Sequence, residues 1–161
     1  LIKSSVKNWE NDDEIAEVLG KILRKEIGDG RGLIYGMGHP VYTLSDPRAV
    51  MLKKYAGEMA TGTEFEKEFR LLEAVERLTP AVFESIKKSG KTMCANIDMY
   101  SGFVYKMLGI PDDLFTPLFA VSRIAGWCAH RFEEINSGKR IMRPAYKSIA
   151  REKEYVDISN R

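Results

Sequence analysis

The segment Gly36-Met37-Gly38-His39 combines two glycines with an imidazole, residue types that can approach and polarise a ligand. Glycines let the backbone come close to a ligand and expose its N–H and C=O groups. By itself the pattern favours a tight turn that carries a surface histidine. It does not match a phosphate-binding loop, because no Gly-Lys-Ser/Thr follows and no strand–helix–strand unit surrounds it.

A second candidate is Asp98, which lies within the segment Asn96 to Gly102 at the start of a stretch with helical period. A carboxylate at this position can cap the helix. It can also serve as a general base where its surroundings tune its proton affinity. Taken alone, this segment favours the cap.

Three arginines lie in settings that suggest anion binding: Arg48 in the first turn of an expected helix, Arg123 in an apolar helix, and Arg143 directly before Pro144. A buried guanidinium needs an acidic partner or an anionic ligand. A residue before proline adopts extended backbone, so its side chain can reach outward from a loop. The three groups could together hold a dicarboxylate. The alternative is three unrelated ion pairs.

Helical periodicity in nearly every segment predicts an all-α fold that positions these groups. The residues 33–42 between the first two helices form a glycine-rich loop. The last helix has an apolar pattern that is typical of a buried helix. The expected helices run from Asn11 or Asp12 up to Gly28, from Pro47 to about Ala60, from a Thr63–Glu66 capping box, from Thr79-Pro80 through Ile86, from about Ile97 to Leu108 before Gly109, and from Thr116-Pro117 to Ser137.

Composition and charge argue against several classes of function. The 161 residues carry a formal net charge of +2 with acids and bases interspersed, so no nucleic-acid partner is expected. No apolar run approaches the roughly 18 residues that span a membrane. Cys94 and Cys128 lack CxxC partners and are expected to be reduced thiols of a cytoplasmic protein. No cluster has metal-ligand spacing, so no metal is expected.

The order and spacing of these groups resemble the citrate synthase family: a GxGHxVY loop, DPRA, an NxDxYSG segment, LFAxSR in a long helix, and RP. In this sequence the motifs occupy residues 36–42, 46–49, 96–102, 118–123 and 143–144. The resemblance covers essentially the whole chain, and five ordered motifs make it specific. It implies a small domain over residues 1–109, a C-terminal segment of the large domain over residues 110–161, and a homodimer.

The resemblance also implies the activity, that of an acyltransferase of the tricarboxylic acid cycle. Such an enzyme condenses acetyl-CoA with oxaloacetate, with the coenzyme A thioester as a co-substrate and no permanently bound cofactor. Asp98 would take a proton from the acetyl methyl group, and His39 would hydrogen-bond the oxaloacetate carbonyl. Arg48, Arg123 and Arg143 would hold carboxylates, with Arg143 reaching across the dimer interface.

Further roles follow from the same resemblance. Phe119 would pack beside the carboxylate site. The backbone from Leu33 and Ile34 through Gly36, Met37 and Gly38 would cradle the adenine end of coenzyme A. Lys91 would lie near the phosphates of coenzyme A.

One difference from the family and two alternatives remain. The chain begins at Leu1, and its first methionine is Met37, so an N-terminal portion is expected to be missing. Family members carry a further histidine in an upstream glycine-rich segment, which stabilises the enol of acetyl-CoA. The other histidine here, His130, is expected to be structural or solvent-facing, so the chain alone is expected to be inactive. The same motifs serve 2-methylcitrate synthase, which uses propionyl-CoA. The third reading is a non-catalytic helical module that binds coenzyme A or a partner.

Overall fold

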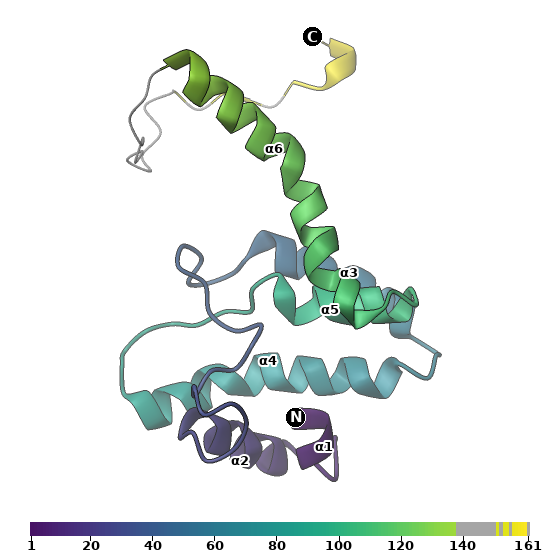
Figure 1. The fold of residues 1–161 in the computed structure, drawn as a ribbon. Helices are drawn as coiled ribbons and strands as arrows, with labels where there is room; N and C mark the ends of the chain where they lie inside the picture. The colour runs from purple at the N-terminus through teal and green to yellow at the C-terminus, as the bar shows by residue number, and fades with distance from the viewer. Residues whose placement is uncertain (138–150, 152, 155, 161) are drawn as a thin grey trace. The chain divides into compact units, whose positions relative to one another are not determined.

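The computed structural model describes residues 1–137, 151, 153, 154 and 156–160, and the chain divides into two units, Leu1–Phe119 and Ala120–Arg161. The described residues are mainly helical, so the all-α prediction is confirmed (Figure 1). Within them, β pairing is limited to one antiparallel bridge between Met37 and Ala95. The elements are α1 (Ile2–Ser5), α2 (Asp12–Leu23), α3 (Pro47–Ala60), α4 (Glu66–Lys87), α5 (Asp98–Met107), η1 (Asp112–Leu114), α6 (Phe115–Ser137) and η2 (Ile158–Asn160).

Helix α4 lies at the centre of the first unit, with α2 on one side and α3 and α5 on the other (Figure 1). Apolar side chains from these helices form one core, and burying each large one stabilises the fold by about 1.5–3 kcal/mol. The core therefore holds together the helices that begin at the candidate residues. Its most deeply buried large side chains are Ile15, Leu19, Leu23, Leu71 and Tyr100.

Local capping explains where two of the predicted helices begin and where a third ends, whereas α2 ends at Leu23, before the predicted Gly28. The side chain of Asn11 accepts hydrogen bonds from the backbone N–H groups of Asp13 and Glu14, which starts α2. Asp46 caps α3 in the same way, with Pro47 at the first helical position. Gly109 follows α5 with φ of +71°, a conformation that suits glycine after a helix end.

Helix α4 is one continuous helix through Pro80, so the predicted start of a separate helix at Thr79-Pro80 is wrong. Proline removes one backbone N–H from the helix interior, which usually breaks or kinks it. Here the buried hydroxyl of Thr79 donates to the carbonyl oxygen of Val75 at 2.6 Å. Apolar residues before and after the proline, including Val75 and Val82, pack on the core. Tertiary packing therefore outweighs the local break.

The capping box predicted at Thr63 and Glu66 is also replaced by a different arrangement. The carboxylate of Glu66 accepts from the backbone N–H of Gly62 at 3.0 Å. The hydroxyl of Thr63 accepts from the N–H of Phe65 and donates to the carbonyl of Ala60. The side chains of Thr63 and Glu66 thus bond within the turn after α3, so they do not form a capping box. Helix α4 begins at Glu66.

Helix α6 begins one residue before the predicted Thr116, and none of its residues is buried. Val121, Trp127 and Phe132 have exposed fractions of 63%, 57% and 72%, although the apolar pattern is typical of a buried helix. A helix acquires a buried face only where another element covers it, and the pattern does not supply that cover. Along the chain, the division between the two units falls within α6, after Phe119. The domain boundary at residues 109/110 stays a prediction.

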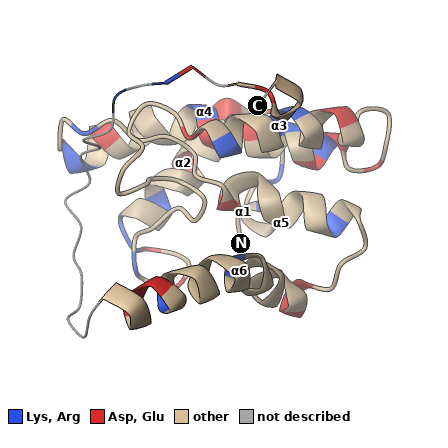
Figure 2. Ribbon diagram, turned by 90° about the horizontal axis from the view of Figure 1, so that it is seen from above, with Lys and Arg blue, Asp and Glu red and all other residues tan. Residues whose placement is uncertain are grey.

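Charged side chains of both signs are interspersed along α3 and α4 (Figure 2). In the part of the chain that the structure describes, no helix is long and apolar enough to cross a membrane. The free thiols are Cys94, which is half-buried, and Cys128, which is exposed.

Candidate functional site

Backbone pairing brings the glycine segment beside the residues that precede α5. The N–H of Gly38 donates to the carbonyl of Cys94 at 2.8 Å, and the N–H of Asn96 donates to the carbonyl of Gly36 at 2.8 Å. The side-chain amide of Asn96 donates to the carbonyl of Gly38 at 2.9 Å, and its oxygen accepts from the N–H of Asp98 at 2.9 Å. Asn96 therefore links the glycine segment to the first residue of α5.

Gly36 lies so close to α5 that no side chain fits. Its φ is +86°, and a Cβ atom there would lie 2.8 Å from the Cα of Met99. Real Cβ atoms do not approach backbone atoms this closely, so a larger residue would push the loop and the helix apart.

We expect Gly36→Ala to lower the free energy of unfolding by about 2–4 kcal/mol, because backbone strain adds to the steric clash. Gly62→Ala is the matched control, since Gly62 also has a positive φ of +72° but an added Cβ would meet nothing within 4 Å. Urea unfolding followed by helical circular dichroism measures both. Equal losses for the two variants would show that the contact with α5 is unimportant.

The imidazole of His39 is held in one tautomer by its own loop. Its Nδ1 accepts from the backbone N–H groups of Val41 and Tyr42 at 3.0 and 3.1 Å. A nitrogen that accepts these bonds carries no proton, so the neutral ring is protonated at Nε2. Nε2 lies 3.3 Å from Nη2 of Arg48, and both nitrogens are then donors. Two adjacent donors suit an oxygen-rich, anionic ligand.

Arg48 is oriented by Asp46 through two hydrogen bonds. Its Nε donates to Oδ1 at 3.0 Å and its Nη2 to Oδ2 at 2.8 Å. The side chain of Asp46 is buried, whereas that of Arg48 is 42% exposed, and Nη1 has no hydrogen bond to a described residue. The bond to Asp46 raises the pKa of Arg48 against the effect of burial, and attraction to Asp98 contributes further. Arg48 and Asp98 therefore lie in one electrostatic neighbourhood.

Hydrogen bonding from Arg48, opposed by burial, holds the pKa of Asp46 below its usual value. A lowered folded-state pKa stabilises the protein above the unfolded carboxyl pKa of about 3.9, and this contribution is lost as the pH falls through the folded value. We expect Asp46→Asn to flatten the loss of thermal stability from about pH 5 to about pH 2, while its amide oxygen still caps α3. Arg48→Gln should also make thermal stability fall less steeply over this pH range. An unchanged loss of thermal stability at acid pH in both variants would contradict the pairing of Asp46 with Arg48.

Asp98 is exposed and faces a hollow of about 400 Å³. Its carboxylate has no hydrogen bond to another described residue, so the cap that the sequence favoured does not form; the N-cap residue of α5 is Ile97. The rest of the hollow has a mainly apolar lining that includes three aromatic side chains. These lining residues are Ser101, Gly102, Tyr105, Phe115, Thr116 and Phe119. A base beside an apolar hollow can receive a small acyl group.

The structure thus brings together Asp98, His39, Arg48 and Phe119 within the first unit. Arg123 belongs to the second unit, where its Nη1 donates to the hydroxyl of Ser122 at 2.9 Å, and its role stays a prediction. Arg143 lies outside the described residues.

The proposed cradle for coenzyme A also stays a prediction. Leu33 is 54% exposed, whereas Ile34 is buried in the core. The N–H groups of Met37 and Gly38 already donate to the carbonyls of Ile34 and Cys94, so a ligand would have to use the other backbone groups. Lys91 is exposed on the loop after α4.

A polar junction near the starts of α3 and α5 was not predicted from the sequence. It consists of Lys53 on α3, Glu76 on α4 and Tyr100 on α5, which lie 23 and 24 residues apart in the two hydrogen-bonded pairs. The only signal in the sequence is a tyrosine two residues after Asp98. Its partners lie on other helices and cannot be found by local spacing.

Comparison with known proteins agrees with the motifs. The family model "Citrate synthase, C-terminal domain" matches residues 3–145. A citrate synthase of Deinococcus radiodurans is 38% identical over 151 residues, which are 93% of this chain and 37% of that protein. A 2-methylcitrate synthase of Shewanella oneidensis is 33% identical over 157 residues, which are 97% of this chain and 36% of that protein.

A solved structure is similar as well. The crystal structure of citrate synthase from Thermotoga maritima has 31% sequence identity and a TM-score of 0.65, covering 99% of this chain and 41% of that chain. This chain therefore spans less than half the length of these relatives. The family model matches most of the chain, and the relatives align with nearly all of it. The chain therefore belongs to the citrate synthase family and corresponds to the C-terminal part of its members.

Proposed function

We propose that this chain carries the acyl-activating part of a citrate synthase, which condenses acetyl-CoA with oxaloacetate to give citrate and coenzyme A. The observation that carries the proposal is the cluster of Asp98, His39 and Arg48, assembled by the pairing of residues 36–38 with residues 94–96. A non-catalytic module would have no physical need for a carboxylate base beside a paired donor site.

The chemistry explains why these groups are needed together. A thioester methyl group is a very weak carbon acid, so a carboxylate base needs help from donors that stabilise the enol and polarise the electrophile. Asp98 would take one methyl proton, and the enol carbon would bond to the ketone carbon of oxaloacetate. The ketone oxygen would gain a proton and become the hydroxyl. Hydrolysis of the thioester would then release citrate and the free thiol.

The tautomer of His39 fits this role, because its Nε2–H can donate to the ketone oxygen of oxaloacetate. The Nη1 of Arg48, which has no hydrogen bond to a described residue, can hold one carboxylate. Arg123 and Arg143 would supply further guanidinium groups. Oxaloacetate is a dianion, so such a clamp would fix it in attack geometry. Phe119 would border the acyl group, and residues 33–38 with Lys91 would bind coenzyme A. The working form would be a cytoplasmic homodimer.

The second candidate is 2-methylcitrate synthase, which uses propionyl-CoA. The two donors differ by one methylene, which changes transition-state binding by only about 1–3 kcal/mol. Gly102 leaves room in its wall, since a Cβ there would lie 3.4 Å from the ring of Phe115 in ordinary contact.

The test uses a full-length protein of the family that carries residues 1–161 as its C-terminal part, called here the full-length test protein. Its release of free thiol is followed with oxaloacetate and either acetyl-CoA or propionyl-CoA. We expect a kcat/KM at least tenfold higher for acetyl-CoA, a difference of about 1.4 kcal/mol. A preference for propionyl-CoA would support the second candidate, and no release from either donor would support the non-catalytic module.

A further inference from the structure

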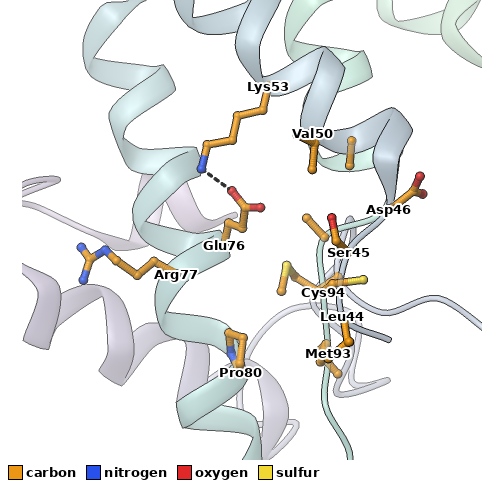
Figure 3. Close-up of a pocket in the computed structure, with 13 residues that line it drawn as sticks. Leu44, Ser45, Asp46, Val50, Lys53, Glu76, Arg77, Pro80, Met93 and Cys94 are labelled. Carbon is orange, nitrogen blue, oxygen red and sulfur yellow. Dashed lines mark hydrogen bonds and ion pairs between the residues drawn. The ribbon is translucent and has the colours of Figure 1, made fainter. Parts of the chain in front are cut away.

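Three helices of the first unit meet at one carboxylate. Oε2 of Glu76 on α4 accepts from Nζ of Lys53 on α3 at 2.8 Å and from the hydroxyl of Tyr100 on α5 at 2.5 Å. Figure 3 shows the side chain of Lys53 extending from α3 to Glu76, at the edge of a hollow of about 430 Å³. One oxygen atom thus links all three helices.

Burial and charge together keep the two hydrogen-bond donors of this junction protonated. The ring of Tyr100 is fully buried, and the side chains of Lys53 and Glu76 are 35% and 27% exposed. Burial, together with the bond to Glu76, raises the pKa of Tyr100 far above its usual range, so its hydroxyl remains a neutral donor. Burial opposes the charge of Lys53, but Glu76 and then Glu73 outweigh it and raise the pKa of the lysine. Both donors therefore keep their protons at neutral pH.

The junction lies close to the ends of the helices that carry the site. Tyr100 follows Asp98 by two residues in the first turn of α5, which is about 3 Å along the helix axis. Lys53 follows Arg48 by five residues on α3, about 7.5 Å along its axis. A displacement at Glu76 would therefore reach both Asp98 and Arg48.

The junction adds a polar contact to the direct packing of α3 on α5. The pairing of residues 36–38 with residues 94–96 fixes the loop to the segment before α5, and it does not join α5 to α3. The buried residues of α3 are Ala49, Ala56 and Ala60, whose small side chains give a smooth face. Polar contacts define a register more sharply than such a face does.

We propose that Glu76 is a positioning residue, which sets α5 relative to α3 and so holds the Asp98 carboxylate in register with Arg48 and His39. The effect on catalysis rests on the function proposed above. Glu76 acts through Tyr100 and Lys53, and it does not touch the substrate in this role.

The first experiment uses the 161-residue chain and needs no activity. Amide hydrogen exchange is measured by NMR in residues 98–101, with α2 as an internal reference. We expect Glu76→Gln and Tyr100→Phe each to speed exchange in residues 98–101 about tenfold while α2 changes little. Together they should have less effect than the product of the two, because they act on one contact. Glu73→Gln is the matched control. Glu73 lies on α4, as Glu76 does, and its Oε1 is 3.5 Å from Nζ of Lys53.

The results separate positioning from general stability. Tyr100→Phe keeps the buried ring, so it remains informative if Glu76→Gln does not fold. Equal acceleration in all helices would show a merely structural role and overturn the proposal. No acceleration in residues 98–101 would overturn it as well.

The second experiment measures kcat and KM in the full-length test protein. We expect Glu76→Gln to lower kcat about tenfold with little change in the KM for oxaloacetate, and Glu73→Gln to change neither. An active parent with an unchanged kcat in Glu76→Gln would overturn the positioning role and leave the proposed function intact. If the parent releases no thiol, the proposed function fails, and the exchange measurement alone decides whether Glu76 holds α5 in place.

Discussion

Asp98→Asn is expected to lower the kcat for thiol release by about 10³-fold in the full-length test protein, with little change in oxaloacetate affinity. A general base contributes about 10²–10⁴-fold, and an amide of the same shape cannot accept the proton. The exposed carboxylate faces its hollow without a hydrogen bond to another described residue, so the substitution leaves no buried partner unpaired. Steady-state kinetics with acetyl-CoA and oxaloacetate measure the effect.

The control is Asp113→Asn, which changes an exposed carboxylate in η1 outside the cluster. It should keep the kcat of the parent. A kcat within a fewfold of the parent for Asp98→Asn would mean that another group takes the proton. A loss of oxaloacetate affinity equal to the loss of kcat would instead place Asp98 in binding.

The 161-residue chain assayed by itself is expected to release no thiol above background from acetyl-CoA and oxaloacetate. The proposed chemistry needs a donor for the enol oxygen besides His39, and removal of one such donor typically costs about 10²–10³-fold in rate. The second histidine of the sequence, His130, is exposed on α6. The hollow beside Asp98 is open, so exclusion of water and fixation of both substrates are also weak.

The measurement follows free thiol with and without oxaloacetate, and the same chain with Asp98→Asn gives the background. Weak binding of coenzyme A and self-association through the exposed apolar side chains of α6 are compatible with the expectation. Release at about 1 s⁻¹ or faster, a rate typical of an enzyme, would show that the further donor is dispensable. The roles given to His39 and Asp98 would then need revision.

Much of the helical framework could be predicted from the sequence, because its signals are local. Asn11 and Asp46 cap the helices that follow them, and Gly109 follows the last residues of α5. These interactions join residues within one turn, so spacing along the chain is enough to find them. The order of the motifs also predicted the family, together with Asp98, His39 and Arg48 as neighbours.

Where tertiary packing competes with local preference, the sequence was a poorer guide. Thr79-Pro80 predicted a helix start, yet core contacts on both sides carry α4 through the proline. The apolar pattern of α6 is typical of a buried helix, and its side chains are exposed in this chain, because a pattern does not supply the surface that covers it. Both outcomes depend on which elements meet in space.

The sequence by itself determined most of the helices, the caps at Asn11 and Asp46, and the identity of the groups that could do chemistry. Only the tertiary structure decided how those groups are oriented. The amide of Asn96 reaches Gly38 across 58 residues, and the hydroxyl of Tyr100 reaches Glu76 across 24. The proton of His39 is assigned to Nε2 by two backbone donors that depend on the conformation of the loop. Hydrogen bonds require distances near 3 Å, and for groups far apart in the chain only the packed core brings the atoms that close.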